Sequence, residues 1–228
     1  LVGAAATGTV PAEGVLGLVP TGRGNDFARQ LGLPATPAAL AEVLLAARPR
    51  PVDLLETAPR LVVGSVYLGI DSVANGHANR ARWLPGGLAY TYGGLRAVLG
   101  WRPATYVLVV DGVTYHERGY TVVVANSGFY GGGLHVAPDA VVDDGLADVV
   151  VVRHCPRRLF GTVLRELRHG THVRRPEVVV RRGREVTVHA DRPLPAYGDG
   201  DPLAVDAPVA VRVRPGALPV LAPPLSQR

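Results

Sequence analysis

The sequence predicts a small α/β segment up to about residue 52, followed by a β-rich region up to about residue 213. Residues 20–34 contain a glycine-rich turn that opens onto a helix, and residues 36–47 have a helical apolar period. From residue 61 onward, short apolar runs alternate with turn-forming residues, which is typical of strands. The chain has 228 residues, 47% of them hydrophobic, so it can form a globular core.

The first element is an apolar run from Val15 to Val19, which leads into the turn. Gly22 and Gly24 allow a sharp turn and a close approach of the backbone to a ligand. Asn25 or Asp26 is predicted to cap the helix by accepting N–H groups of its first turn. A strand, a glycine turn and a helix N-terminus together favour phosphate binding. The alternative is an ordinary loop between a strand and a helix.

The later elements follow from apolar period and turn residues. A helix is predicted to start at Pro37 after a Thr36 cap and to end before Arg48–Pro51. Arg157–His169 predicts a second helix, with Gly170 as its stop. Strands are predicted at Thr105–Val110 and Tyr120–Ala125, joined by an Asp111-Gly112 turn, at Ala147–Arg153, at Glu177–Val188 paired across Arg182-Gly183, and at Val205–Val213.

The positive charge is concentrated in one part of the chain. All 24 basic residues are arginine, which excludes Schiff-base chemistry and a phosphate-binding lysine. Residues 153–192 hold eleven arginines against four acidic residues. Such a face attracts anionic lipid headgroups or nucleic acid. Phe160 is its one aromatic residue, so base stacking is not expected and membrane contact is preferred. A merely solvated face is the alternative.

The cysteine and histidine residues and the hydropathy of the sequence lead to expectations about burial and cellular location. The lone Cys155 excludes an internal disulfide and is expected to be structural. His169 and His172 are expected to be exposed. The sequence has no run of 18 apolar residues and no basic segment before its apolar start, so we expect a cytoplasmic protein that meets membranes only at the surface. Because the chain begins at Leu1, we expect a fragment or a trimmed product.

Four stretches in register resemble the diacylglycerol kinase catalytic-domain family, which includes sphingosine, ceramide and bacterial lipid kinases. The segment Pro20–Pro34 resembles its Pro-x-Gly-x-x-Asn-Asp-Phe-Ala motif. Gly69-Ile-Asp71, followed by Gly87-Leu-Ala-Tyr90, resembles the family's glycine-aspartate stretch and the helix after it. Asn126–Gly133, with Ala137–Ala140 and Asp144–Asp148, resembles a third block of the family. Asp199-Gly-Asp201 stands where the family has Asp-Gly-Glu. The resemblance runs from about residue 1 to about residue 222.

This resemblance implies a truncated Rossmann-like nucleotide-binding domain followed by a β-sandwich-like domain. The first would comprise residues 1–52, completed by about residues 214–228. The second, residues 53–213, would bind the lipid substrate, with the nucleotide between the two domains.

The resemblance also implies the chemistry of the site, with ATP and Mg²⁺ as cofactors. Asp201 would be the general base, and Asp26 would act through Mg²⁺ or the nucleotide phosphates. The nucleotide-binding residues would be Gly8, Thr9, Gly22, Arg23, Gly24 and Asn25. A structural cation would bind the Asp144 carboxylate and the carbonyls of Val141 and Leu146. Without the family, Asp26 would be a helix cap, and 143–145 and 199–201 would be turns.

Two departures bear on activity. The family's first nucleotide loop reads Gly-Gly-Asp-Gly-Thr, whereas this chain has Ala5, Ala6 and Thr7 before Gly8 and Thr9. Only ten residues then remain up to Val19, so we expect a helix of the family to be missing. Asp201 is also shorter than the glutamate it replaces by roughly 1.5 Å.

The sequence therefore leaves three hypotheses. The first is an ATP-dependent lipid kinase that acts on a diacylglycerol or sphingoid-type hydroxyl. The second is a non-catalytic lipid- or membrane-binding remnant of such a kinase. The third, an NAD-kinase-like enzyme, fits Asn25-Asp26-Phe27 less well. The lipid acceptor and the oligomeric state stay open.

Overall fold

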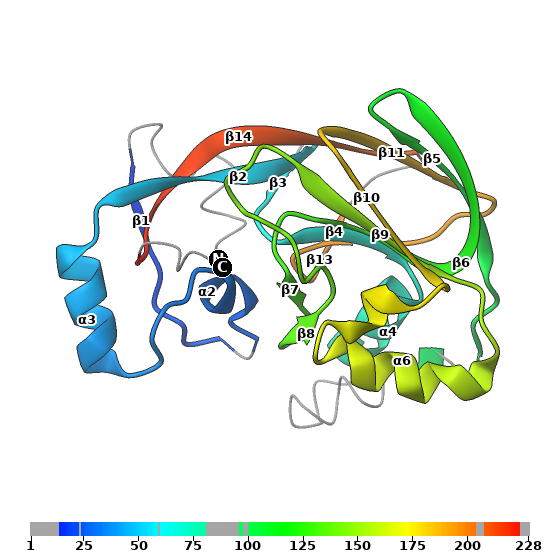
Figure 1. Ribbon diagram of the computed structural model, residues 1–228, viewed down its shortest axis with the longest axis horizontal. Coiled ribbons are helices and arrows are strands. Elements are labelled where there is room, and N and C mark those ends of the chain that lie inside the picture. Colours follow the sequence, from blue (N-terminus) through cyan, green and yellow to red (C-terminus); the bar gives the residue numbers. More distant parts are fainter. Residues whose placement is uncertain are drawn as a thin grey trace.

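The fold of the chain is given by a computed structural model that describes residues 14–22, 24–58, 60–80, 96–97, 100–203 and 208–223 (Figure 1). Its helical elements are α2 (Asp26–Gln30), α3 (Pro37–Ala46), α4 (Ile70–Arg80), η2 (Arg157–Leu159), α6 (Phe160–Leu167) and η3 (Thr171–Arg174). Its strands are β1 (Leu16–Gly17), β2 (Pro49–Thr57), β3 (Arg60–Val62), β4 (Ser65–Gly69), β5 (Ala104–Val110), β6 (Val113–Ala125), β7 (Phe129–Tyr130), β8 (Leu134–His135), β9 (Ala147–Arg153), β10 (Val178–Gly183), β11 (Glu185–Ala190), β12 (Ala196–Gly198), β13 (Asp201–Leu203) and β14 (Val209–Leu221).

Most strands form a β-sandwich made from one continuous, curled sheet. One layer runs β10-β9-β6-β4-β12-β13, and the other runs β6-β5-β11-β14-β2-β3. Strand β6 belongs to both layers, because Val113–Gly119 pairs with β5 whereas Thr121–Ala125 pairs with β4. The register with β9 shifts between Gly119 and Thr121, where a Cβ on Gly119 would lie 2.4 Å from the Val152 carbonyl oxygen. Only glycine therefore fits at the point where the sheet bends.

The sandwich core comes from alternating apolar residues of both layers. In β5, Ala104, Tyr106, Leu108 and Val110 point inward, and Val149 and Val151 of β9 lie in the same cluster. This alternation is the period expected of strands with one buried face. The β-rich part of the fold prediction, including its sandwich-like form, is confirmed.

A smaller lobe, consisting of β1, α2 and α3, adjoins one end of the sandwich, and β2 and β14 run through both parts (Figure 1). Strand β1 pairs in parallel with the end of β14, at Leu16 with Val220. Leu54 of β2 lies in the lobe core, whereas its neighbour Leu55 lies in the sandwich core. The two parts are therefore held together by shared strands. That this lobe is Rossmann-like stays a prediction.

Several predicted elements are confirmed. Helix α3 starts at Pro37 and ends before Arg48, and β5 and β6 are joined at Asp111-Gly112, where both residues have positive φ. Strand β9 has its predicted bounds, and the predicted helix 157–169 is present as η2 and α6, followed by Gly170 at φ 70°. Cys155 is buried, as expected of a structural thiol, and burial raises its pKa.

The predicted hairpin over Glu177–Val188 is wrong. Strand β10 pairs with β9, whereas β11 pairs with β5 and β14, so the chain crosses between layers after Gly183. The Asp111 carboxylate fixes this crossover by accepting the N–H groups of Arg184 and Glu185, at 2.9 and 2.8 Å. The residues of a local turn do not reveal a partner as distant in sequence as Asp111.

Two other expectations differ from the structure. Helix α4 was not predicted and lies in the region from residue 61 onward where strands were expected to dominate; its Ser72, Asn75 and Gly76 are weak helix formers. His172 is fully buried rather than exposed, and its Nε2 lies 3.0 Å from the Val136 carbonyl oxygen. Burial lowers the pKa of His172. Among the described residues, no helix is long and apolar enough to cross a membrane.

Candidate functional site

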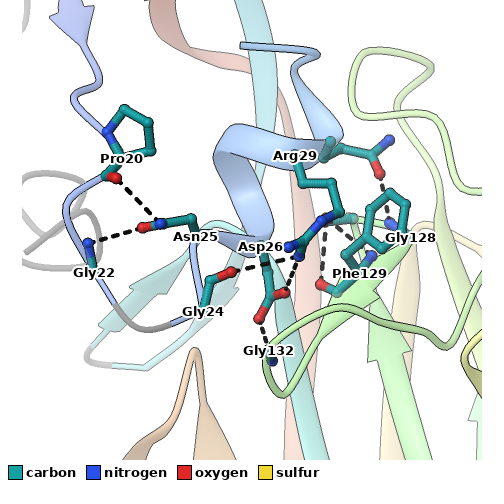
Figure 2. Close-up of polar contacts among 11 residues, drawn as sticks. Pro20, Gly22, Gly24, Asn25, Asp26, Arg29, Gly128, Phe129 and Gly132 are labelled. Carbon is teal, nitrogen blue, oxygen red and sulfur yellow. Dashed lines mark hydrogen bonds and ion pairs between the residues drawn. The ribbon is translucent and has the colours of Figure 1, made fainter. Parts of the chain in front are cut away.

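The glycine-rich turn before α2 is held in shape by Asn25 (Figure 2). The Asn25 Oδ1 accepts the Gly22 N–H at 2.9 Å, and its Nδ2 donates to the Pro20 carbonyl at 3.1 Å. Asn25 has φ 53°, in the left-handed region that asparagine tolerates better than most residues. The predicted capping role is therefore wrong for Asn25, because its side chain points back into the turn and makes no cap hydrogen bond.

Asp26 faces a second glycine turn, 131–133, at the tip of the β7–β8 hairpin. Its Oδ2 accepts the Gly132 N–H at 2.8 Å, and its Oδ1 pairs with the Arg29 Nη1 at 2.9 Å (Figure 2). Asp26 is thus not a helix cap either. The structure brings together two motifs about 100 residues apart in sequence, the helix-opening segment and the Gly-Gly-Gly stretch.

The two turns lie in van der Waals range of each other. A Cβ on Gly24 would lie 3.1 Å from Asp26 Oδ2 and 3.6 Å from the Gly132 backbone. Gly131, Gly132 and Gly133 all have positive φ. Glycine turns of this kind present backbone N–H groups at short range, which suits the oxygens of a phosphate. Two of these N–H groups are already engaged, that of Gly22 by Asn25 and that of Gly132 by Asp26, so a phosphate between the turns would use the remaining ones or displace these side chains.

Arg29 and Gln30 complete the contact between α2 and the hairpin, and the sequence analysis missed both. Arg29 lies over the Phe129 ring, with its guanidinium carbon 5.6 Å from the centroid. The Gln30 Oε1 accepts the Gly128 N–H at 2.9 Å, and its Nε2 donates to the Ala140 carbonyl at 3.3 Å. The spacing of Asp26 and Arg29 was the available signal, because residues three apart are neighbours on a helix.

A second carboxylate, Asp71, reaches the same hairpin from the other side. The Asp71 Oδ2 accepts hydrogen bonds from Thr121 Oγ1 at 3.0 Å and from Tyr130 Oη at 3.1 Å. Tyr130 directly precedes the 131–133 turn. Desolvation raises the pKa of Asp71, although the two hydrogen bonds oppose the shift. The sequence motif Gly69-Ile-Asp71 includes this aspartate, but no role was predicted for it.

Asp199 and Gly200 form the two-residue turn between β12 and β13, and Asp201 is the first residue of β13. The Asp199 carboxylate accepts the N–H groups of Val63, Gly64 and Ser65 at 2.8, 2.8 and 3.1 Å. Asn75 of α4 donates to the Gly200 carbonyl at 2.9 Å. The exposed Asp201 side chain has no polar partner within the described ranges. Asp199 therefore anchors the turn and leaves Asp201 accessible.

The predicted cation site has the right donor chemistry, but its carboxylate is already engaged. Asp144 Oδ1 accepts the Leu146 N–H at 3.0 Å, and Oδ2 pairs with Arg182. Arg182 also lies 3.4 Å from the buried Asp148. Burial raises the pKa of Asp148 to about 6, which Arg182 opposes. Across the ranges that the structure describes, no three His, Cys, Asp or Glu side chains are grouped as metal ligands.

The predicted residues thus fall into separate groups. Gly22, Gly24, Asn25 and Asp26 lie together at the start of α2. Asp144, with Val141 and Leu146, belongs to the loop before β9. Among the described residues, no side-chain hydrogen bond or ion pair joins either group to Asp201. Gly8, Thr9, Arg23 and the segment Gly87–Tyr90 lie outside the described residues.

Two family models match this sequence. The diacylglycerol kinase catalytic domain matches residues 2–57, and the YegS C-terminal NAD kinase β-sandwich-like domain matches residues 64–222. The chain is 35% identical over 220 residues to a diacylglycerol kinase of Mycobacterium tuberculosis, a match that covers 91% of this chain and 69% of that protein. It is 32% identical to a probable YegS-like lipid kinase of Pseudomonas fluorescens, over 96% of this chain and 73% of that protein.

The fold has a solved counterpart. A crystal structure of a candidate diacylglycerol kinase from Bacillus anthracis matches with a TM-score of 0.80, over 96% of this chain and 72% of that one. Its 21% identity supports the fold alone. The catalytic-domain match followed by the β-sandwich match defines a protein of the lipid-kinase class. The chain belongs to the family of diacylglycerol kinases and YegS-like lipid kinases, which confirms the resemblance of its motifs.

Proposed function

We propose that this chain is an ATP-dependent lipid kinase that transfers the γ-phosphate to the hydroxyl of a diacylglycerol or sphingoid-type lipid. The contact between Asp26 and Gly132 carries this proposal, because it joins the helix-opening turn to a second glycine turn. Family membership supports the reaction class, and the fit of the two turns to phosphate supports the nucleotide.

The roles of the residues follow from their positions. The turn around Gly22, Gly24 and Asn25 would bind the nucleotide phosphates through its backbone N–H groups, with Asn25 releasing that of Gly22. Arg29, beside Asp26, adds a positive charge at the same place. ATP supplies the phosphoryl group when bound, and Mg²⁺ neutralises part of its charge. Asp26 would orient this assembly.

Asp201 would take the proton of the lipid hydroxyl. A general base must be within hydrogen-bond reach of the proton and must not be held by another group. The Asp201 carboxylate is exposed and has no polar partner among the described residues. Asp199 holds the turn that carries it through three backbone N–H groups. This rigid anchor favours accurate placement of a shorter side chain than the family's glutamate.

We propose a structural role for a cation at Asp144, with the carbonyls of Val141 and Leu146. Oxygen donors of this kind suit Mg²⁺ or Ca²⁺. Because Arg182 holds one carboxylate oxygen, the cation would have to displace that arginine. Raising the cation concentration should then stabilise the protein, and more so in the Arg182→Gln variant.

The test is transfer of labelled phosphate from Mg-ATP to diacylglycerol or sphingosine in detergent micelles. Asp201→Ala should abolish turnover, and Asp26→Asn should reduce it by about 100-fold. Glu185→Gln is the matched control, because this exposed acid pairs with Arg212 on the sandwich surface and with no other arginine in the described ranges. Unchanged turnover in Asp201→Ala would remove Asp201 from the mechanism.

The second candidate is a non-catalytic lipid-binding remnant. One observation favours it, namely that both Asp26 carboxylate oxygens already have protein partners, Gly132 and Arg29. This candidate predicts binding to lipid vesicles without binding of ATP. Saturable Mg-ATP binding in calorimetry, lost in Asp26→Asn, would exclude it.

A further inference from the structure

Helix α6 and the flanking η2 and η3 carry a group of exposed arginines, which we call the α6 arginine face. It consists of Arg165 and Arg168 at the end of α6, Arg158 of η2 and Arg174 of η3, with Leu164 of α6 beside them. Leu164, Arg165 and Arg168 are exposed, whereas Val163 and Leu167 are buried against the sandwich. Positions three and four apart share one side of a helix, so these exposed residues form a single surface. The apolar side of α6 is already used in packing.

The arginines of this face are not neutralised by the protein. Within the described residues, Arg158, Arg165, Arg168 and Arg174 make no ion pair. Residues 157–175 contain one acidic residue, Glu166, and Arg175 engages it with an Nη2–Oε1 distance of 2.8 Å. The face therefore presents a net positive charge, which favours an anionic partner.

The face lies on the elements next to the glycine turn of the candidate site. Gly170, at the end of α6, packs against Pro138, and His172 of η3 contacts the carbonyl of Val136. Both belong to the segment that follows the 131–133 turn and β8. In Figure 1, α6 lies along the lower side of the view, as do β7 and β8. A flat partner on the arginine face would thus lie close to the site.

We propose that the α6 arginine face docks the chain onto an anionic lipid bilayer. The proposal rests on the proposed function, because a kinase of membrane lipids needs a surface that meets the membrane. Leu164 is 43% exposed in the middle of the arginines, a position from which it can enter the headgroup region. Nucleic acid fits less well, since Phe160 is the one aromatic residue between 157 and 175. The helix binds by its charges and keeps its apolar side in the core.

The experiment is co-sedimentation of the chain with phosphatidylcholine vesicles, with and without phosphatidylglycerol, in the absence of ATP. Binding should require phosphatidylglycerol and weaken with salt. The triple variant Arg158→Gln/Arg165→Gln/Arg168→Gln should bind about 100-fold more weakly, since each basic residue near the surface contributes about equally. Leu164→Ala should lower the affinity several-fold.

A charge-matched control separates this face from net charge. The triple variant Arg48→Gln/Arg60→Gln/Arg184→Gln removes three exposed arginines from other parts of the chain, and both variants lower the formal charge from +5 to +2. The control should keep wild-type binding. Equal loss in both variants, or binding to vesicles without anionic lipid, would overturn the proposal. Tighter binding to a DNA or RNA duplex than to vesicles, lost in the α6 variant, would assign the face to nucleic acid instead.

The kinase assay in micelles keeps the two proposals apart. A chain that phosphorylates lipid in micelles but does not bind anionic vesicles contradicts the docking face and leaves the kinase assignment intact. A chain that binds vesicles through α6 but transfers no phosphate supports the face and contradicts the kinase. Unchanged melting temperatures of both triple variants would show that the variants fold.

Discussion

The small lobe and the sandwich share the strands β2 and β14 but are stabilised differently. In the sandwich, both layers supply residues such as Leu108 and Val149 to one continuous core, and acids such as Asp199 accept backbone N–H groups. In the lobe, the described core is smaller, and the acid of α2 pairs with Arg29 and Gly132 near the surface. The sandwich thus carries Asp201, and the lobe carries the helix-opening glycine turn. A less extensively packed lobe would suit the proposed nucleotide site, because elements with fewer buried contacts open more easily.

The largest effect should come from removing a core side chain in each part. Leu108 is fully buried in the sandwich, and Leu31 is 2% exposed in the lobe. Leu108→Ala should lower the free energy of unfolding by about 4 kcal/mol, and Leu31→Ala by about 2–3 kcal/mol because the lobe can relax around it. Urea unfolding gives the values. In hydrogen exchange, Leu31→Ala should expose amides of α2 and α3 alone, and global exposure would show that the two parts unfold as one.

The second effect concerns the buried Asp148 of β9, a strand that is paired on both sides. Its pKa is raised to about 6, chiefly by burial, above the value of about 3.9 in an unfolded chain. The folded state therefore binds the proton more tightly, and this stabilisation is lost as the pH rises through about 6. Above that pH, Asp148→Asn should be more stable than the wild type by at most about 3 kcal/mol.

The internal control for Asp148 is the same variant at low pH. Near pH 4 the two proteins should unfold at closely similar urea concentrations, because Asp148 is then protonated in the folded state. A difference that does not depend on pH would assign the effect to the contact with Arg182 rather than to titration.

The third effect separates two acids of one turn. Asp199→Ala leaves the N–H groups of Val63, Gly64 and Ser65 without their acceptor and should cost about 2 kcal/mol of stability. Asp201→Ala removes an exposed side chain and should leave the melting temperature unchanged while it abolishes the proposed activity. A destabilised Asp201→Ala variant would contradict this division of roles.

The sequence predicted the parts of the fold that depend on local signals. Pro37 after Thr36, the Asp111-Gly112 turn and the alternating apolar residues of β5 and β9 each identify an element by short-range chemistry. The crossover after Gly183 was missed because it depends on Asp111, which is 72 residues away and whose carboxylate holds the next two N–H groups. The same limit applies to the fully buried His172.

The sequence motifs pointed to residues of the candidate site but not to the contacts between them. The motifs identified Asp26 and the Gly-Gly-Gly stretch separately, and only the fold brings Gly132 against Asp26. Asn25 was expected to cap the helix, but the positive φ turns its side chain toward Gly22. Backbone conformation of this kind depends on what packs around the turn, so no residue pattern alone could specify it.

The smallest effect tests the contact between lobe and sandwich at Gln30. Its amide bonds to Gly128 and Ala140 from α2, so Gln30→Ala should lower the free energy of unfolding by only about 1 kcal/mol. The local result should be clearer than the global one, since the Gly128 amide loses its acceptor and should exchange faster. Gln30→Glu keeps an acceptor oxygen for Gly128 but not the donor to Ala140, so it should restore slow exchange at Gly128 alone. If Gln30→Ala changes neither stability nor exchange at Gly128, the Gln30 amide does not hold the lobe against the sandwich. The shared strands β2 and β14 and the Asp26–Gly132 contact would then position α2.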